Sequence, residues 1–349
     1  MSVKYIPVQW NANKWVYDAV LLACVALYIW IYLRVGLPAA DVTRPPDGAI
    51  QRMRAFGSCA FLMLTVILCI GPLARLDRRF LPLLYNRRHF GVLTAIVALT
   101  HAVYVLDWYF AFSPTPKLEA LLTANTSYDR ILGFPFEALG IFALMVLGLL
   151  AATSHDFWLS FLGAPLWKRL HLLIYPAYAA VVAHVTLGYL QDTSNPAFPM
   201  VVALGALAVS GLTLAAWAKD RGAHAGKAEW VSAGRWDAIP DGRAAILALG
   251  PSERVAVFRN GDTLSAVSNA CAHQNGPLGE GRIIDGCITC PWHGFQYRPE
   301  DGCSPAPFTE RIPTYRLKLE GDEVLVHRTA NPPGTAVAPT PLPAAEIAA

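Results

Sequence analysis

The sequence predicts a multi-domain protein, in which an all-α, six-helix transmembrane bundle is followed by a small all-β domain. The chain has 349 residues, of which 54% are hydrophobic and only 15% are charged, and this is too apolar for an ordinary soluble protein. Apolar runs near the ~20 residues that cross a bilayer fill the first two-thirds. The last third changes to short alternating runs separated by turn residues, which is typical of β-strands.

The expected domain boundaries follow this change of pattern. We expect a cytoplasmic N-terminus over 1–14, without the apolar core and cleavage site of a signal peptide, and a membrane domain over 15–218. A polar linker over 219–228 leads to a β domain over 229–329. A tail over 330–349, rich in Pro and Ala, should be disordered. The six expected spans are 15–36, 55–75, 89–111, 133–153, 168–190 and 197–218.

Basic residues near the ends of the runs predict the orientation, because cytoplasmic loops carry an excess of Lys and Arg. Most of them lie in the N-terminus, in the second and fourth loops and after the sixth run. Both termini, and with them the β domain, should therefore face the cytoplasm. The net charge of +3 is small and scattered, so it does not indicate nucleic-acid binding. The lipid bilayer is the expected surrounding of the first domain.

Two half-sites in the last third of the chain predict a metal centre. Cys271 and His273 form a C-x-H pair, and Cys290 and His293 form a C-x-x-H pair, each in a turn-rich loop. Two thiolates and two imidazoles can bind zinc, or a [2Fe–2S] cluster with the thiolates on one iron and the imidazoles on the other. Because each half-site supplies one Cys and one His, the pattern favours the cluster. Cys287 adds a C-x-x-C with Cys290, so spacing alone leaves zinc open.

The sequence around these residues resembles the Rieske family. The stretches C-A-H-Q-N-G-P-L-G-E-G and D-G-C-I-T-C-P-W-H-G carry the resemblance, which covers about 229–329. It implies that Cys271 and Cys290 hold the inner iron and that His273 and His293 hold the outer, more exposed iron.

The chain departs from the high-potential branch of the Rieske family. It lacks the additional cysteine of each loop and the serine two residues after the last histidine. Tyr297 matches the tyrosine of that branch and is placed to donate a hydrogen bond to a cluster thiolate, which would raise the reduction potential. We expect a value in the lower half of the Rieske range of about −150 to +300 mV, as in ferredoxin-type Rieske proteins.

Three histidines lie within the expected spans, where ionisable side chains are costly and usually functional. His101 lies in the third run, and His171 and His184 lie in the fifth. Since a helix rises about 1.5 Å per residue, His171 and His184 differ in depth by about 20 Å, and His101 can face His184 at the outer level. A haem b held by one histidine from each of two helices explains this arrangement. Hydrogen bonding within the bundle is the alternative.

The membrane domain resembles the ferric-reductase-like transmembrane superfamily. The segments R-R-H-F-G-V at 87–92, H-A-V-Y-V-L-D at 101–107 and W-K-R-L-H-L-L-I-Y at 167–175 carry this resemblance, which covers about 50–218. It is similar to the haem-bearing membrane subunit of the bacterial periplasmic methionine sulfoxide reductase system. It implies a multi-pass protein of the bacterial inner membrane.

The same resemblance implies that His101 and His184 ligate one haem, and that His171 holds a second or alternative position. His89 lies at the right depth to be the inner partner, but it is about 120° away from His101 around an ideal helix. One of the two arginines before His89 is the alternative occupant of that position. The number of haems, one or two, stays open.

Together these features predict an electron-transfer oxidoreductase similar to ferric reductases, and no catalytic side chain is assigned. Electrons would pass from a cytosolic donor, such as a flavin reductase or a ferredoxin, through the cluster and haem b to a periplasmic acceptor or redox partner. No G-x-G-x-x-G motif follows an expected strand, so no nucleotide domain is predicted. One alternative is reverse flow, from quinol or the periplasm to a cytosolic acceptor. Another is a membrane-anchored Rieske module without haem that senses redox state or docks a partner.

Overall fold

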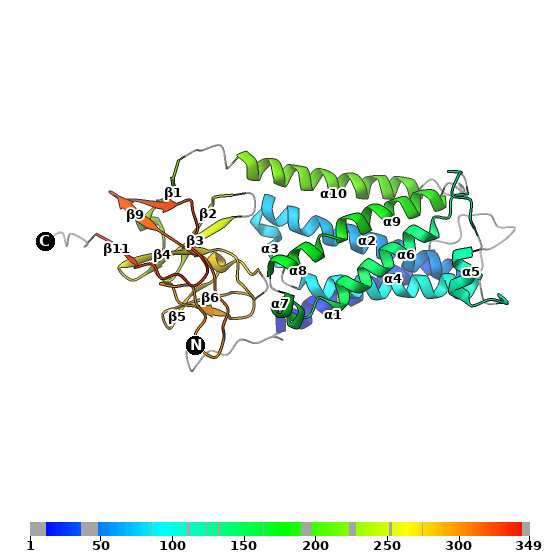
Figure 1. Ribbon diagram of the computed structural model, residues 1–349, viewed down its shortest axis with the longest axis horizontal. Helices are drawn as coiled ribbons and strands as arrows, with labels where there is room; N and C mark the ends of the chain where they lie inside the picture. The colour runs from blue at the N-terminus through cyan, green and yellow to red at the C-terminus, as the bar shows by residue number, and fades with distance from the viewer. Residues whose placement is uncertain are drawn as a thin grey trace. The chain divides into compact units, whose positions relative to one another are not determined.

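The computed structural model describes most of the chain (Figure 1). The described residues are 12–35, 48–84, 86–109, 112–123, 125–131, 133–162, 164–189, 197–222, 228–250, 253–273 and 275–343. The expectations for residues 1–11, for the middle of the linker and for 344–349 fall outside these ranges. The chain divides into two compact units, a helical unit over Ala12–Ala215 and a second unit that contains the β domain.

Long apolar helices that run side by side form the helical unit (Figure 1). The helices are α1 (Ala12–Val35), α2 (Gly48–Leu76), α3 (Leu81–Leu84), α4 (Arg87–Tyr109), α5 (Lys117–Thr123), α6 (Glu137–Ala152), α7 (Asp156–Leu162), α8 (Ala164–His171), α9 (Ile174–Tyr189) and α10 (Ala197–Gly222). Within the described residues, five helical segments are long and apolar enough to cross a membrane. The fourth expected span, 133–153, corresponds to α6, which is apolar but has only 16 residues.

The fifth expected span is interrupted where it was predicted to be continuous. α8 ends at His171 and α9 begins at Ile174, with a turn between them. Pro176 lies in the first turn of α9, where its missing N–H costs no helical hydrogen bond. Leu166–Tyr189 still forms one apolar segment of 24 residues, long enough to span. The phase between His171 and His184 is therefore not that of one ideal helix.

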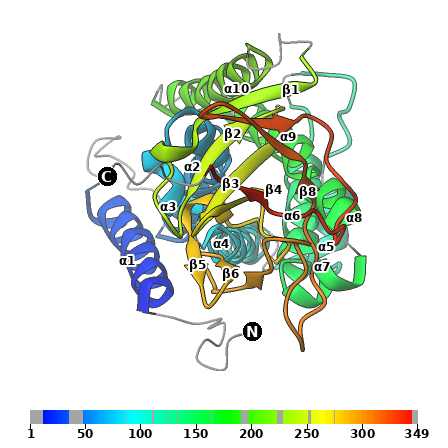
Figure 2. The ribbon, with the colours of Figure 1, turned by 90° about the vertical axis from the view of Figure 1, so that its left-hand side faces the viewer.

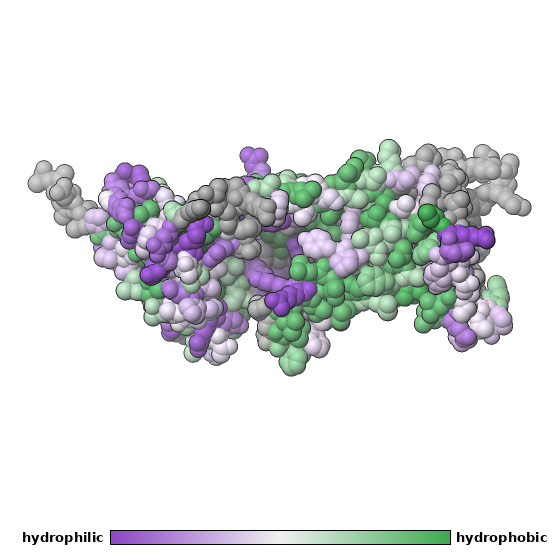
Figure 3. Space-filling model, turned by 45° about the horizontal axis from the view of Figure 1, so that its top comes forward, coloured by the Kyte–Doolittle hydropathy of each residue, from purple (hydrophilic) through white to green (hydrophobic). Residues whose placement is uncertain are grey.

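The packing of the helical unit pairs α2 with α4 and α6 with α9. The core between them includes Leu64 of α2, Leu147 of α6 and Tyr178 of α9. The hydroxyls of Thr65 and Tyr178 share a hydrogen bond of 3.0 Å there. Large apolar side chains also cover the outer face shown in Figure 3. An apolar exterior of this extent needs lipid to cover it, and the helical unit is a membrane domain.

The β domain consists of short antiparallel strands. The strands are β1 (Trp230–Arg235), β2 (Ala244–Ala248), β3 (Arg254–Asn260), β4 (Thr263–Ser268), β5 (Arg282–Ile284), β6 (Cys287–Thr289), β7 (Gln296–Tyr297), β8 (Thr314–Tyr315), β9 (Leu317–Glu320), β10 (Glu323–His327) and β11 (Thr340–Pro341). β2, β3 and β4 lie side by side in one sheet (Figure 2), which β8 and β11 extend through β4. A second sheet has the order β1-β10-β9, and a third the order β5-β6-β7. The expected hairpins β3–β4 and β9–β10 are both present.

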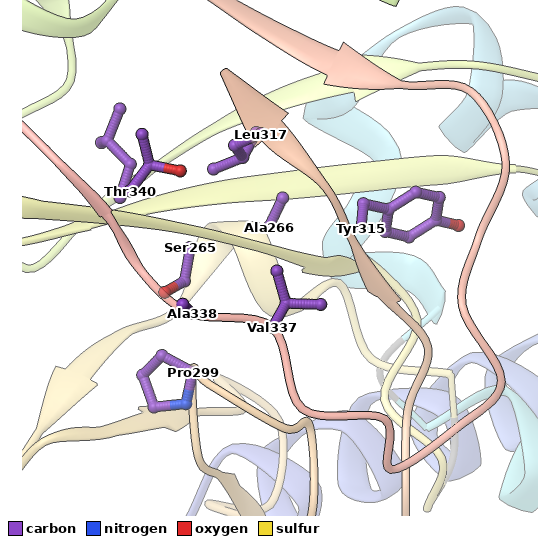
Figure 4. Close-up of a pocket in the computed structure, with 9 residues that line it drawn as sticks. Ser265, Ala266, Pro299, Tyr315, Leu317, Val337, Ala338 and Thr340 are labelled. Atoms are coloured by element: carbon purple, nitrogen blue, oxygen red, sulfur yellow. The ribbon is translucent and has the colours of Figure 1, made fainter. Parts of the chain in front are cut away.

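The tail expected to be disordered from residue 330 is instead ordered up to Pro343. β11 pairs with the edge of β4, and Leu342 packs against the core of the main sheet. The N–H of Val337 also donates to the carbonyl of Glu300 at 2.7 Å. The segment lies along β4 and β8 and leaves a cavity of about 10 Å³, close to the space that one water needs (Figure 4). This corrects both the disordered tail and the domain end at 329, because a Pro-rich segment can still pair at a sheet edge.

Candidate metal centres

Two loops of the β domain present the predicted cysteines and histidines, and each loop is closed by its own backbone. In the first loop, the N–H of Cys271 donates to the carbonyl of Gly276 at 2.9 Å, and the N–H of Asn275 donates back to Cys271 at 2.8 Å. In the second, between β6 and β7, the N–H of Cys290 donates to the carbonyl of Phe295 at 2.8 Å. Asn275 has a positive φ of 60°, which asparagine tolerates. These bonds fix the ligand side chains before any metal binds.

The structure brings all four predicted ligand residues together and sorts them into pairs by chemistry. The thiols of Cys271 and Cys290 hydrogen-bond to each other. The ring centroids of His273 and His293 lie 5.0 Å apart, and the two ring planes make an angle of 88°. All four side chains are buried. Cysteine therefore faces cysteine and histidine faces histidine, although each loop supplies one of each.

This sorting tests whether the residues fit a two-iron cluster. Two imidazoles on one metal, with bonds of about 2.0 Å and a tetrahedral angle, would have ring centres about 5.2 Å apart, close to the 5.0 Å found. In the part of the chain that the structure describes, no three His, Cys, Asp or Glu side chains are grouped to hold a single metal ion, as one structural zinc would require. The geometry fits a [2Fe–2S] cluster with thiolates on one iron and imidazoles on the other.

Tyr297 makes the predicted contact with the thiolate pair. Its hydroxyl lies 3.2 Å from the sulfur of Cys271 and accepts the N–H of Ala272 at 3.1 Å. Burial alone would raise the pKa of Cys271, but hydrogen bonds from Cys290 and Tyr297 lower it to about 7. For Cys290, the hydrogen bond to Cys271 and burial both raise the pKa well above its usual value. The site therefore favours one thiolate even before iron adds its charge.

Two further residues support this centre in ways that the sequence did not predict. The ring of Phe295 stacks on His273, with centroids 4.1 Å apart and planes 13° apart, and holds the imidazole in place. Gly276 leaves room for the second cysteine, because a Cβ there would lie 2.6 Å from the sulfur of Cys290. Cys287 begins β6 and is half-buried, outside the cysteine pair.

In the membrane domain, the structure brings the rings of His101 of α4 and His184 of α9 close together. Their ring centroids are 6.5 Å apart. The Nδ1–H of His101 donates to the carbonyl of Met53 at 2.9 Å, and that of His184 donates to the carbonyl of Phe136 at 2.9 Å. Both bonds leave the lone pair on Nε2, the nitrogen that an iron would need. Two imidazoles on opposite sides of one iron would have ring centres about 6.4 Å apart, so this pair fits a haem.

His171 lies apart from this pair and has an aromatic neighbour. Its ring stacks on Trp167, with centroids 3.8 Å apart, and its Nδ1–H donates to the carbonyl of that residue at 3.0 Å. The Nε2 of His171 is buried. The guanidinium of Arg88 lies over the ring of the same Trp167, 5.0 Å from its centroid. Arg88 of α4 therefore lies on the tryptophan against which His171 stacks.

His89 makes a different contact from the one considered in the sequence. Its Nδ1 lies 2.7 Å from a carboxylate oxygen of Asp18 on α1, and Asn86 donates to the other oxygen at 2.5 Å. Both members of the ion pair are partly exposed. This contact ties α1 to the start of α4. It uses only Nδ1 of His89, so a role for this residue as a haem ligand stays a prediction.

Comparison with known proteins supports both centres. The profile of the Rieske [2Fe-2S] domain matches residues 229–316, and that of the ferric reductase like transmembrane component matches 56–182. The chain is 33% identical over 184 residues to the protein-methionine-sulfoxide reductase heme-binding subunit MsrQ of Caulobacter vibrioides, covering 52% of this chain and 79% of that protein. It is 34% identical over 101 residues to the anthranilate 1,2-dioxygenase ferredoxin subunit of Burkholderia cepacia, covering 29% of this chain and 93% of that protein.

Among solved structures, the ferredoxin of carbazole 1,9a-dioxygenase from Nocardioides aromaticivorans is 25% identical, with a TM-score of 0.27. The matched region covers 29% of this chain and 98% of the ferredoxin.

The fold and the two sets of ligand side chains define a membrane-bound electron-transfer protein with a Rieske [2Fe–2S] domain. More narrowly, the chain belongs to the ferric-reductase-like transmembrane family that includes the heme-binding subunit MsrQ. Membership of these two families implies a [2Fe–2S] cluster and haem b as cofactors. It also implies a protein of the bacterial inner membrane.

Proposed function

We propose that this chain is a membrane oxidoreductase that moves electrons from a cytosolic donor, through its Rieske centre and a membrane haem b, to a periplasmic redox partner. When bound, the cluster and the haem each accept and release one electron. The 6.5 Å spacing of His101 and His184 carries the proposal, because it prepares a second redox centre in the same chain as the cluster ligands.

The ligand assignments follow from the contacts already described. Cys271 and Cys290 would hold one iron of the cluster, and His273 and His293 the other. The hydroxyl of Tyr297 stabilises negative charge on the sulfur of Cys271. Burial of the four ligands excludes water from the cluster and keeps this hydrogen bond strong.

We propose that His101 and His184 would hold the haem, at the level that the charge distribution assigns to the periplasmic side. The last turn of α2 and the loop after it carry Arg75, Arg78 and Arg79, and the positive-inside tendency puts this loop in the cytoplasm. The Rieske domain follows α10 and would lie on the same side as that loop. Electrons would then travel outward. A relative whose name describes a subunit of a reductase supports a protein partner as the acceptor.

A second haem near the cytoplasmic face is the other candidate, and His171 favours it. Its lone pair lies on a buried Nε2, as in the outer pair. The outer haem alone would leave about 20 Å of the membrane without a redox centre. Such a haem would be held by His171, with Arg88, which lies over the ring of Trp167, as a candidate second residue.

Cofactor stoichiometry in the purified full-length protein tests the proposal. We expect one haem b per [2Fe–2S] cluster from the pyridine haemochrome spectrum, iron analysis and cluster EPR. Substituting His101→Ala or His184→Ala should remove that haem and leave the cluster, while His155→Ala, at an exposed turn, should change neither. His293→Ala should do the reverse.

Each other result has a defined meaning. Two haems per cluster, one of them lost in His171→Ala, would establish the second candidate. An intact cluster without haem would refute the conduit and leave the helices as an anchor.

Vectorial electron transfer tests the direction. The protein would be reconstituted into vesicles with a trapped ferric acceptor, and the cluster reduced from outside in molecules whose Rieske domain faces outward. We expect reduction of the trapped acceptor, and its loss in His293→Ala. Transfer only from a trapped reductant to an external acceptor would instead establish the reverse flow.

A further inference from the structure

The two halves of the membrane domain repeat the same ligand-holding unit. His184 follows His101 by 83 positions, Gly140 follows Gly57 by 83, and Phe136 follows Met53 by 83. Both carbonyl-to-histidine contacts span 48 residues and measure 2.9 Å. The hairpin of α2 and α4 therefore presents its histidine as the hairpin of α6 and α9 presents its own.

A glycine packs against the same edge of each imidazole, the one formed by Nδ1 and Cε1. A Cβ added at Gly57 would lie 2.8 Å from Nδ1 of His101, and one added at Gly140 would lie 2.9 Å from Nδ1 of His184. Real Cβ atoms essentially never approach this closely, so each ring rests directly on the backbone of the neighbouring helix. The contact is edge-on at the nitrogen that donates to the carbonyl one turn earlier.

These two contacts fix the plane of each ring and not only its position. The hydrogen bond sets the direction of Nδ1–H, and the glycine surface allows no rotation toward the neighbouring helix. Because each ring is fixed to its own hairpin, the relation between the hairpins sets the angle between the planes. That angle is 81°, so the imidazoles are nearly perpendicular.

We propose that Gly57 and Gly140 are positioning residues that hold the axial imidazoles perpendicular and so set the electronic structure of the haem. This inference rests on the proposed ligation by His101 and His184. Perpendicular imidazole planes leave two iron d orbitals nearly equal in energy, whereas parallel planes split them. The axial ligands are among the means by which a protein tunes haem iron.

The ferric low-spin EPR spectrum of the full-length protein reports the angle without any turnover. We expect the wild type to give a highly anisotropic signal with one dominant large g value. Gly57→Ala and Gly140→Ala should each turn a ring and shift the signal toward a rhombic spectrum with three resolved g values. The matched control is Gly148→Ala in α6, where an added Cβ meets nothing within 4 Å and should leave the spectrum unchanged.

The possible results separate this inference from the assignment of the ligands. A rhombic wild-type spectrum would refute the inference, as would unchanged spectra in both Gly57→Ala and Gly140→Ala. Loss of haem in one of these variants leaves the wild-type spectrum as the deciding measurement. If His101→Ala and His184→Ala keep a full complement of haem, the ligation itself is wrong. If these two histidine variants lose the haem and the wild-type EPR spectrum is rhombic, the ligation stands and only the positioning role of the glycines fails.

Discussion

Replacing Tyr297 with phenylalanine should lower the reduction potential of the cluster. The hydroxyl contacts the sulfur of Cys271 at 3.2 Å and is itself bonded by the N–H of Ala272 at 3.1 Å, so its direction is fixed. A hydrogen bond to a charged group is worth about 1.5–3 kcal/mol. Reduction adds negative charge to the cluster, so about 1–1.5 kcal/mol of this should be specific to the reduced state. For a one-electron couple, that corresponds to a fall of about 40–65 mV.

An EPR-monitored redox titration of the full-length protein measures this shift. The control is Tyr315→Phe, because Tyr315 is also buried but its hydroxyl donates to Glu253, in the other core of the β domain. We expect the control to match the wild type. A potential for Tyr297→Phe within about 10 mV of the wild type would refute the reasoning, since the predicted energy is several times larger.

Three further changes test other parts of the structure. Gly276→Ala should abolish cluster assembly, because the added Cβ would lie 2.6 Å from the sulfur of Cys290. Iron analysis and EPR measure the cluster content. A retained cluster would show that the loop can move to make room for the Cβ. Glu229→Gln should lower the melting temperature at pH 6, and this difference should shrink as the pH falls below about 4.5 and vanish below the depressed pKa of the folded state. The hydrogen bond and charge of His327 depress the pKa of Glu229, so the stability that Glu229 contributes is present above its unfolded-state pKa and is lost as the pH falls. A difference in melting temperature between the variant and the wild type that persists in acid would contradict this. Deleting 330–349 should destabilise the β domain by about 2–4 kcal/mol, measured by denaturant unfolding, and an unchanged midpoint would mean that the ordered tail adds no stability.

The Rieske centre was predictable in detail because its chemistry is local in sequence. The four ligands and Tyr297 lie within 27 residues, and each loop is closed by its own hydrogen bonds, so spacing determines geometry. The stacking of Phe295 on His273 was not predictable, since an aromatic residue beside a ligand loop is equally compatible with an ordinary core position.

The membrane site was predictable only in part, because its supports are backbone atoms. The depth of His101 and His184 follows from helix rise, and the structure pairs them as expected. The carbonyls of Met53 and Phe136 belong to residues whose side chains give no sign of this use. Their shared offset of 83 positions was the one signal in the sequence.

Helix geometry also predicted that His89 lies on a different side of its helix from His101, but it could not predict the contact of His89 with Asp18. Asp18 is 71 residues earlier and on another helix. The order of the tail was missed for a related reason. Composition measures how much a segment can bury, whereas this segment is held by backbone bonds to an existing sheet edge.

The division of the haem ligands between two hairpins has a consequence for biogenesis. The ribosome synthesises His101 well before His184, and the first hairpin can enter the bilayer while the second is still being made. With the ligation proposed here, the first hairpin alone offers a single axial nitrogen, and haem captured at that stage would be weakly held. Stable haem capture would therefore report that both hairpins have been inserted and docked. Retention of haem would then act as a checkpoint that separates finished molecules from incomplete ones.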